Sequence, residues 1–198
     1  MAQPRGETRT KLLDAALEAF ARHGFAGASI RAITRAVGVR ESAFYAHFPS
    51  KRAAYDELFA EAGPAVVARL VDEIPIDAAP EDVLPALAGD IIAAWSTPHA
   101  RAFASVVVRE AFGGNASSRT VLLGGIEEAL AGLARRFTAW GLAEPETQAY
   151  QFVSPIVMAR LLFFTIDASA AEMRRGADLV AAHAASFVAS LRRAAVIG

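Results

Sequence analysis

The sequence contains no cysteine, which excludes disulfide bonds, a thiolate zinc site and a thiol nucleophile. Its four histidines, at positions 23, 47, 99 and 183, form no His-x-x-x-His pair, so we expect no metal site. The sequence also lacks a run of about 18 apolar residues, and charges interrupt its start where a signal peptide would need an apolar stretch. We therefore expect a cytoplasmic protein that has no metal or other cofactor and does not enter a membrane.

Charge is unevenly distributed along the chain. Residues 1–52 contain nine lysines and arginines against four acidic residues, whereas residues 53–198 contain eleven against seventeen. The formal charge is therefore +5 at the N-terminal end and −6 over the remainder. A cationic end on an acidic body favours a polyanionic partner for that end, although surface solvation alone also explains such a split.

Apolar residues recur at helical spacing along almost the whole chain, and no stretch alternates apolar and polar residues as a strand would. The pattern predicts an all-α protein, and an apolar content of 54% is ample for a core. Ser29 and Ser50 are suited to cap helix starts, and Gly24 and Gly38 to end helices. We expect about nine helices, over residues 8–23, 30–37, 42–48, from 51 with a kink or break at Gly63-Pro64, 80–96, 98–112, 117–140, 145–167 and 170–195.

The stretch VRESAFYAHFPSK, residues 39–51, crowds aromatic rings and cations directly after a glycine. On a helix over 42–48, Phe44 and Phe48 share one side, and Ser42 and Ala46 point the opposite way. A helix that enters the major groove needs such a small outward face, because bulky residues would hold its backbone away from the base edges. Two short helices joined at Gly38 therefore predict a helix-turn-helix.

The remaining residues of this stretch are suited to phosphate. Tyr45 and His47 can donate to phosphate oxygens, and Lys51 stands in the first turn of the next helix, where free N–H groups favour an anion. Each also has a plainer interpretation: a half-buried ring for Tyr45 and packing for His47. Arg31 and Arg35 can equally be solvated charges on their helix.

The run GFAGASIRAITRAVGVRESAFYAHFPSK, from Gly24 to Lys51, resembles the DNA-binding segment of the TetR (tetracycline-repressor) family of bacterial transcription regulators. The matching features are Phe25, the cap at Ser29, apolar residues at 30 and 33, VGV, and FYAHFPSK. One departure is Ser42, which stands where many members carry glycine, and leucine is commoner than the residues at 54 and 55. These departures make the operator sequence harder to infer.

The resemblance implies two domains, a helix-turn-helix domain over 1–52 and a larger effector-binding and dimerisation domain over 53–198. It also implies that the operator is double-stranded DNA, with bases read in the groove and phosphates held at its edges. The implied DNA contacts are Ser29, Arg31, Arg40, Glu41, Ser42, Ala43, Tyr45, Ala46, His47 and Lys51.

A short recognition helix covers few base pairs, so specific binding needs two copies on paired half-sites of a palindromic operator. The last two helices are rich in alanine, and two subunits could pair them as a four-helix bundle, as family members do. The alternative is that their apolar stripes close the core of one subunit. The candidate dimer residues are Tyr150, Val153, Val157, Leu161 and Phe164 on one helix, and Leu179, His183, Phe187 and Leu191 on the other.

By analogy with the family, the middle helices hold a cavity for a small apolar or aromatic effector of unknown identity, with Arg109 or Glu110 as a polar anchor. Plain core packing is the alternative for each of these residues. The candidate pocket residues are Trp95, Phe103, Val107, Arg109, Glu110, Phe112, Phe137, Trp140, Phe152 and Met158.

These features together predict a ligand-responsive regulator of transcription, and repression is the habit of the family. An all-α enzyme is the main rival, but the sequence has no clustered histidines, no glycine-rich phosphate loop and no pair of acids that would flank a reaction centre. A protein-binding adaptor is the third possibility, against which the cationic N-terminal end argues.

Overall fold

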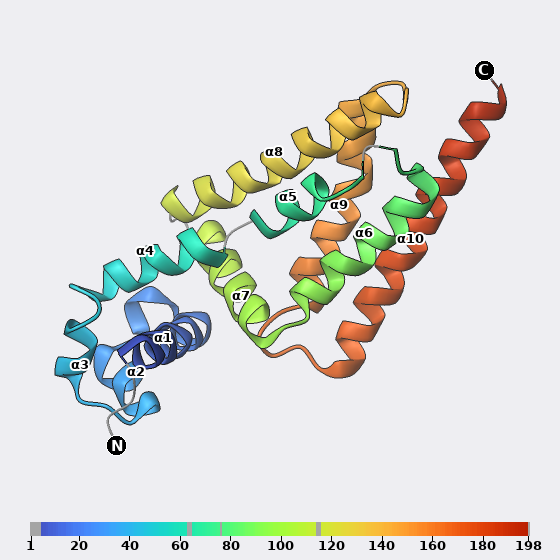
Figure 1. The fold of residues 1–198 in the computed structure, drawn as a ribbon. Helices are drawn as coiled ribbons and strands as arrows, with labels where there is room; N and C mark the ends of the chain where they lie inside the picture. The colour runs from blue at the N-terminus through green and yellow to red at the C-terminus, as the bar shows by residue number, and fades with distance from the viewer. Residues whose placement is uncertain (1–4, 63–64, 76, 114–115, 198) are drawn as a thin grey trace.

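The computed structural model describes residues 5–62, 65–75, 77–113 and 116–197, and every regular element in these ranges is a helix. The predicted all-α fold is confirmed. Figure 1 shows the helices α1 (Arg5–Gly27), α2 (Ile30–Val37), α3 (Glu41–Tyr45), α4 (Lys51–Ala62), α5 (Ala65–Asp72), α6 (Pro80–Trp95), α7 (Pro98–Phe112), α8 (Ala116–Ala139), α9 (Pro145–Phe163) and α10 (Ala170–Ile197). The described part contains ten helices where nine were expected, because α4 and α5 are separate elements. The Gly63-Pro64 pair between them lies outside the described residues.

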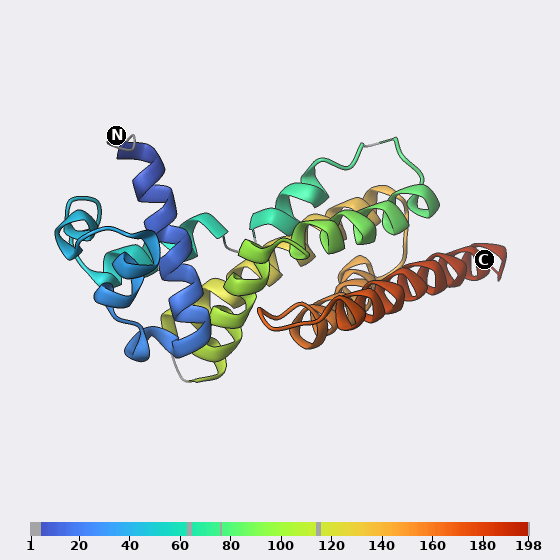
Figure 2. The same cartoon turned by 90° about the horizontal axis from the view of Figure 1, so that it is seen from below.

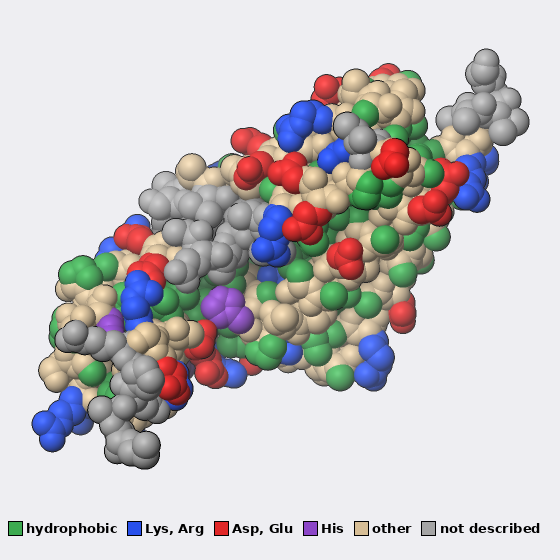
Figure 3. All heavy atoms as spheres, in the orientation of Figure 1, with side chains coloured by type: hydrophobic (Ala, Val, Ile, Leu, Met, Phe, Trp, Pro, Cys, Tyr) green, Lys and Arg blue, Asp and Glu red, His purple; other side chains and the backbone are tan. Residues whose placement is uncertain are grey.

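The molecule is elongated. Figure 1 shows α1, α2 and α3 at the end that holds the N-terminus, α4 leading away from them, and α5 to α10 forming the larger half. Acidic side chains are spread over the face of the larger half that Figure 3 displays, in line with the charge division of the sequence. None of the described helices combines the length and the apolar character that a membrane-spanning segment needs.

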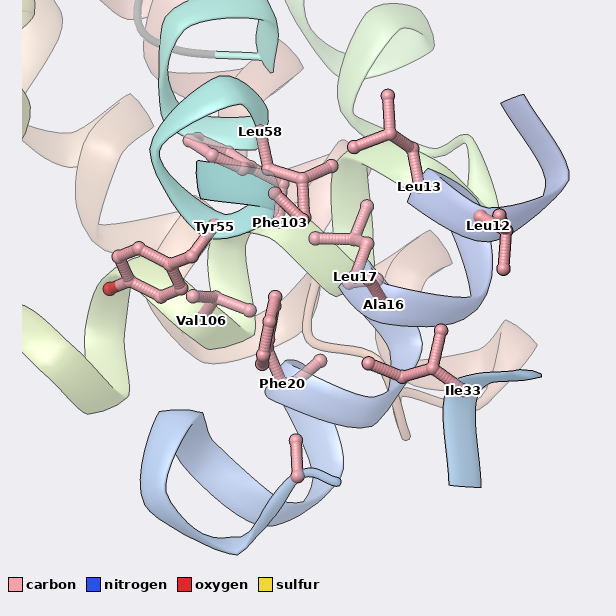
Figure 4. Close-up of a cluster of buried hydrophobic side chains, with 14 of the residues drawn as sticks. Leu12, Leu13, Ala16, Leu17, Phe20, Ile33, Tyr55, Leu58, Phe103 and Val106 are labelled. Atoms are coloured by element: carbon pink, nitrogen blue, oxygen red, sulfur yellow. The ribbon is translucent and has the colours of Figure 1, made fainter. Parts of the chain in front are cut away.

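The first hydrophobic core joins the N-terminal helices to the larger half. Its centre is the apolar stripe of α1, which includes Leu12 and Phe20, and Ile33 of α2 packs on this stripe. The same cluster contains Phe103 and Val106 of α7, as the close-up in Figure 4 shows. Burying each such side chain stabilises the fold by about 1.5–3 kcal/mol, so α7 contributes to the stability of the N-terminal end.

A second core lies wholly within the larger half. Leu84 of α6, Leu133 and Phe137 of α8, and Phe152 of α9 are fully buried or nearly so there, and Phe187 of α10 stacks on Phe137. Helices α5, α6, α8, α9 and α10 all contribute apolar side chains to it.

Two arginines tie the helix ends of the larger half together. Arg101 of α7 donates from Nε to the carbonyl oxygen of Thr165 at 2.9 Å, and its Nη2 donates to two further carbonyls in the turn that follows α9. Arg160 of α9 donates to the carbonyl oxygens of Trp95 at 3.1 Å and Ala100 at 2.6 Å, where α6 ends and α7 begins. Burial lowers the pKa of Arg160 to about 9. Carbonyls in the last turn of a helix and in the turn after it lack partners within the helix, and Arg101 and Arg160 donate hydrogen bonds to carbonyls of this kind after α9 and at the end of α6.

The predicted helix boundaries hold at most ends and differ by three or four residues at four. Helix α1 begins at Arg5 rather than at residue 8. Helical geometry in α1 breaks at Gly24, with φ 70° and ψ 170°, but one more turn follows before the chain leaves for α2. Helix α3 ends at Tyr45 rather than at 48. Helix α9 ends at Phe163 rather than at 167, and the four residues after Phe163 form an irregular turn.

Candidate nucleic-acid interface

The turn between α2 and α3 is built from local signals. The Oγ atom of Ser29 accepts a hydrogen bond from the backbone N–H of Ala32 at 3.1 Å and so caps α2, as predicted. At the other end, Gly38 has φ 77°, a left-handed conformation that favours glycine. The N–H of Val39 then donates to the carbonyl oxygen of Thr34 at 2.9 Å, which closes the helix end and directs the chain into α3.

The segment around α3 has one buried side and one exposed side. Phe44 and Phe48 are fully buried in the first core, with ring centroids 5.3 Å apart. Ser42 and Ala46 are exposed. The predicted division into an aromatic seat and a small outward face is therefore confirmed, and a groove-reading surface needs such a division.

Tyr45 and His47 flank this outward face differently. Tyr45 is 55% exposed, whereas His47 is half-buried with its ring 6.3 Å from the ring of Phe48. Ala43 is half-buried. Of these residues, Tyr45 is the one most accessible to a phosphate at the edge of the groove.

A surface groove of about 640 Å³ opens between the end of α2 and the start of α3. The three guanidinium groups of Arg31, Arg35 and Arg40 belong to its lining, together with Glu41. None of the three arginines forms a salt bridge within the described part of the chain. Arg35 is not among the predicted DNA contacts. Its spacing of four residues from Arg31 and five from Arg40 is the one feature of the sequence that indicates a shared surface.

Lys51 opens α4, as predicted, and its ammonium group is bound inside the protein. Its Nζ donates to the carbonyl oxygens of Phe25 at 2.6 Å and Ala28 at 2.7 Å, and lies 4.5 Å from the centroid of the Phe25 ring. Two of the three ammonium donors are therefore used inside the protein. These partners lie 23 and 26 residues earlier in the chain, so no local pattern reveals them.

The predicted effector anchors face the N-terminal helices. The Oε1 atom of Glu110 accepts a hydrogen bond from the backbone N–H of Phe25 at 3.3 Å. A Cβ atom placed on Gly24 would lie 3.4 Å from Cδ of Arg109. Both residues thus lie beside residues 24 and 25, where the helical geometry of α1 breaks.

The other predicted pocket residues do not line a single space. Phe103 and Val107 belong to the first core. The second core contains Phe137 and Phe152, and Trp95 and Trp140 pack against it. Met158, predicted to line the pocket, is 55% exposed on α9, which corrects that expectation. The side chain of Phe112 lies outside the described residues.

The predicted dimer residues divide between the surface and the core. Tyr150 and Leu179 are 64% and 50% exposed, and Val157 and Leu161 are half-buried. Phe164 is fully buried, so it cannot lie on the outer surface of the subunit, contrary to expectation.

The rest of the predicted dimer stripe also faces inward. Phe187 is buried, and Val153 and Leu191 pack on the second core. The Nε2 atom of His183 lies 2.9 Å from the carbonyl oxygen of Phe152. The sequence interpretation missed Leu162, which is 61% exposed on the same side of α9 as Met158.

A capped helix, a glycine turn and a second helix with a small exposed face, all seated on α1, define a helix-turn-helix DNA-binding protein. Residues 12–62 match the family described as bacterial regulatory proteins, tetR family. The segment that carries the helix-turn-helix therefore matches this family, as the sequence resemblance indicated.

Solved structures share the fold over nearly the full chain. Salmonella enterica GusR is 18% identical, with a TM-score of 0.69 over 97% of this chain and 98% of GusR. A transcriptional regulator of the TerR/AcrR family from Aquifex aeolicus is 17% identical, with a TM-score of 0.66 over 87% and 95%. The fatty acid degradation regulator FadR from Bacillus halodurans is 18% identical, with a TM-score of 0.60 over 90% and 97%. No curated protein matches the chain in sequence.

Proposed function

We propose that the protein is a cytoplasmic repressor that binds a palindromic operator as a homodimer and is released from it by a small apolar effector. The observation that carries this proposal is the exposed, small face of Ser42 and Ala46, in a segment that also carries the accessible ring of Tyr45 and follows an arginine-lined groove in the chain. Such a face lets a helix backbone approach the base edges.

Each residue of the surface has a distinct role in this proposal. Ser42, Ala43 and Ala46 lie against base edges, and Tyr45 and His47 donate to phosphates. Arg31, Arg40 and Glu41 line the groove beside the bases, and the capped start of α2 at Ser29 approaches a phosphate. Phosphate contacts set affinity and orientation, and base contacts set sequence preference.

The apolar residues exposed on α9 and α10 support a second copy of the chain as the partner. Tyr150, Met158, Leu162 and Leu179 are each at least half exposed. Met158 and Leu162 are one turn apart on α9 and so share a face of the helix, and exposed apolar patches mark interfaces. Figure 2 shows α10 along the edge of the larger half with no other described helix on its outer side, so a partner's helices could pack there.

The second core is the proposed place of the effector, with Trp95, Phe137, Trp140 and Phe152 as its apolar contacts. Apolar walls with few polar groups are typical of small-molecule sites. An effector can release DNA only if it binds the DNA-competent and incompetent arrangements unequally, by about 1–3 kcal/mol in typical cases.

Footprinting on the DNA that flanks the protein's own gene tests the proposal, first alone and then with a panel of small apolar compounds. We expect a protected palindrome whose occupancy falls steeply with salt, because each neutralised phosphate releases counterions. A flat salt dependence would contradict DNA binding and favour an adaptor. Turnover of the compound that releases the DNA would favour an enzyme instead.

A further inference from the structure

Phe25 is held from two sides by residues of two different helices. Its carbonyl oxygen accepts a hydrogen bond from Nζ of Lys51 on α4 at 2.6 Å. Its backbone N–H donates to Oε1 of Glu110 on α7 at 3.3 Å. Both polar groups of this residue's backbone are thus bound by side chains that are far away in sequence.

The side chain of Phe25 is held as well. The centroid of its ring lies 5.7 Å from that of Phe20 and 5.0 Å from that of Tyr55. The Nζ atom of Lys51 lies 4.5 Å from the centroid of the Phe25 ring. A cation above an aromatic face is attracted by the ring's electron density. Contacts from α1 and α4 therefore fix the ring, while Glu110 fixes the peptide.

This residue lies directly on the route to the start of α2. Lys51 also binds the carbonyl oxygen of Ala28 at 2.7 Å, and Ser29, the cap of α2, is the next residue. The N–H of Ala28 in turn donates to the carbonyl oxygen of Gly24 at 3.1 Å. The position of the α2 start thus depends on Lys51 and, through Phe25, on α7.

We propose that Lys51 and Glu110 are positioning residues that clamp Phe25 so that α2 keeps a fixed place relative to α7, and that Lys51 does not bind the DNA backbone. The DNA-binding part of this inference rests on the proposed function. The clamp gives the larger half a direct hold on the DNA-binding surface, in addition to the chain connection through α4.

The alternative role for Lys51 is a phosphate contact. To reach a phosphate with all its donors, Lys51 would have to leave two carbonyl oxygens without a partner. Leaving partly buried acceptors unpaired reduces the stability of the fold. The position of Lys51 near the start of α4 favours an anion, but two of its three ammonium donors are already bound to carbonyl oxygens inside the protein.

Salt titrations distinguish these two roles. Binding of a random-sequence duplex is measured against salt for the wild type, Lys51→Met and Arg40→Ala. We expect Arg40→Ala to make the slope shallower by about 0.9 for each phosphate that is no longer neutralised. Lys51→Met should weaken binding several-fold with the slope of the wild type. A shallower slope for Lys51→Met, like that of Arg40→Ala, would overturn the proposal.

Hydrogen exchange tests the clamp without DNA. Glu110→Ala removes the acceptor of the Phe25 N–H, and Glu127→Ala on α8 removes a carboxylate of equal charge on another helix. We expect faster exchange of the Phe25 amide in Glu110→Ala and wild-type exchange in Glu127→Ala. Equal exchange in both variants would refute the clamp, even if Lys51→Met failed to fold. If the wild type failed to bind DNA, the proposed function would be contradicted, whereas the hydrogen-exchange result would still test the clamp on Phe25.

Discussion

The ring of Phe44 packs edge-on against the ring of Tyr45, with centroids 5.8 Å apart, although Phe44 is fully buried and Tyr45 is 55% exposed. A side chain of the core thereby supports an exposed side chain on the proposed DNA-binding surface. Edge-on aromatic pairs contribute about 0.5–1.5 kcal/mol beyond their buried area. The hydroxyl of Tyr45 is thus presented on a rigid support.

We expect Tyr45→Phe to weaken binding to all duplex sequences alike. The change keeps the ring contact with Phe44 and removes a hydroxyl donor to phosphate, and a hydrogen bond to a charged group is worth about 1.5–3 kcal/mol. Fluorescence anisotropy with several duplexes measures the effect, and Thr147→Val, which removes an exposed hydroxyl from α9, is the control. Unchanged affinity in Tyr45→Phe would remove the phosphate contact.

Arg35→Ala should make the dependence of DNA affinity on salt shallower. Arg35 lines the groove with Arg31 and Arg40 and has no acidic partner in the described part, so its charge is available to a phosphate. Removing one neutralising cation reduces the slope of the logarithmic plot by about 0.9. Arg174→Ala, an exposed arginine on α10, is the matched control. Identical slopes for the two variants would show that Arg35 is only solvated.

Leu162→Asp should convert a dimer into monomers. An aspartate at this position would place an unpaired charge in the proposed interface, where it costs far more than at an open surface. Light scattering at micromolar concentration measures the mass. Leu123→Asp on α8 is the control, because Leu123 is also exposed, at 45%, and lies on another helix. A monomeric wild type, or a dimeric Leu162→Asp variant, would contradict the proposed interface.

Phe164→Ala should destabilise the subunit itself. Its ring is fully buried, and a Cβ added to Gly176 of α10 would meet the ring's Cε2 atom at 2.8 Å, which shows how closely the two segments pack. Truncation of a buried phenylalanine costs about 3–5 kcal/mol. Urea unfolding followed by circular dichroism measures this loss, whereas Leu123→Ala should cost about 0.5 kcal/mol or less. A small effect for Phe164→Ala would show that the site collapses around the cavity.

Helix α10 should lose part of its stability in acid through Glu172. The Oγ and N–H of Ser169 donate to Oε2 of Glu172 at 2.7 and 2.8 Å, and these bonds lower the pKa of Glu172 below its ordinary 4.5. Because the folded pKa lies below the unfolded one, the stabilisation is complete above pH 4.5 and is lost as the pH falls through the folded value. The difference in urea midpoint between the wild type and Glu172→Gln should therefore shrink on acidification. A difference that does not vary with pH would rule out this linkage.

Local signals allowed much of the fold to be predicted. Helix α7 has the bounds that the sequence indicated, because Pro98 opens it and Thr97 caps it. The hydroxyl of Ser50 accepts from the N–H of Ala53 at 3.0 Å, as its position before α4 indicated. Such signals depend on residues three or four apart, so the sequence displays them directly.

The stripes on the last two helices were harder to predict, and α10 shows why. A four-residue step turns about 40° past a full circle, so three steps from Leu179 to Leu191 rotate the stripe by about 120°. The stripe therefore starts at the surface and ends in the core, through the half-buried His183. On α9 the helix ends before Phe164, so helical spacing no longer describes where that side chain lies.

Contacts between distant segments account for the remaining differences. Residues 24 and 25, where α1 breaks, are approached by Lys51, Arg109 and Glu110. These partners are far away in sequence, so the helical periodicity of the chain gives no indication of the contacts. The exposed and buried sides of the segment around α3 were easier to predict, because they alternate within a few residues.

Phe103 and Val106 of α7 fill the same core as Leu12 and Phe20 of α1. A chimaera that received only residues 12–62 from another regulator would place a foreign α1 against this α7. The side chains of the two helices, which pack together in the first core, would then no longer be complementary. A successful graft has to bring the facing side chains of α7 with it. Changing only the exposed residues of α2 and α3, in order to alter operator preference, leaves the packing between α1 and α7 intact.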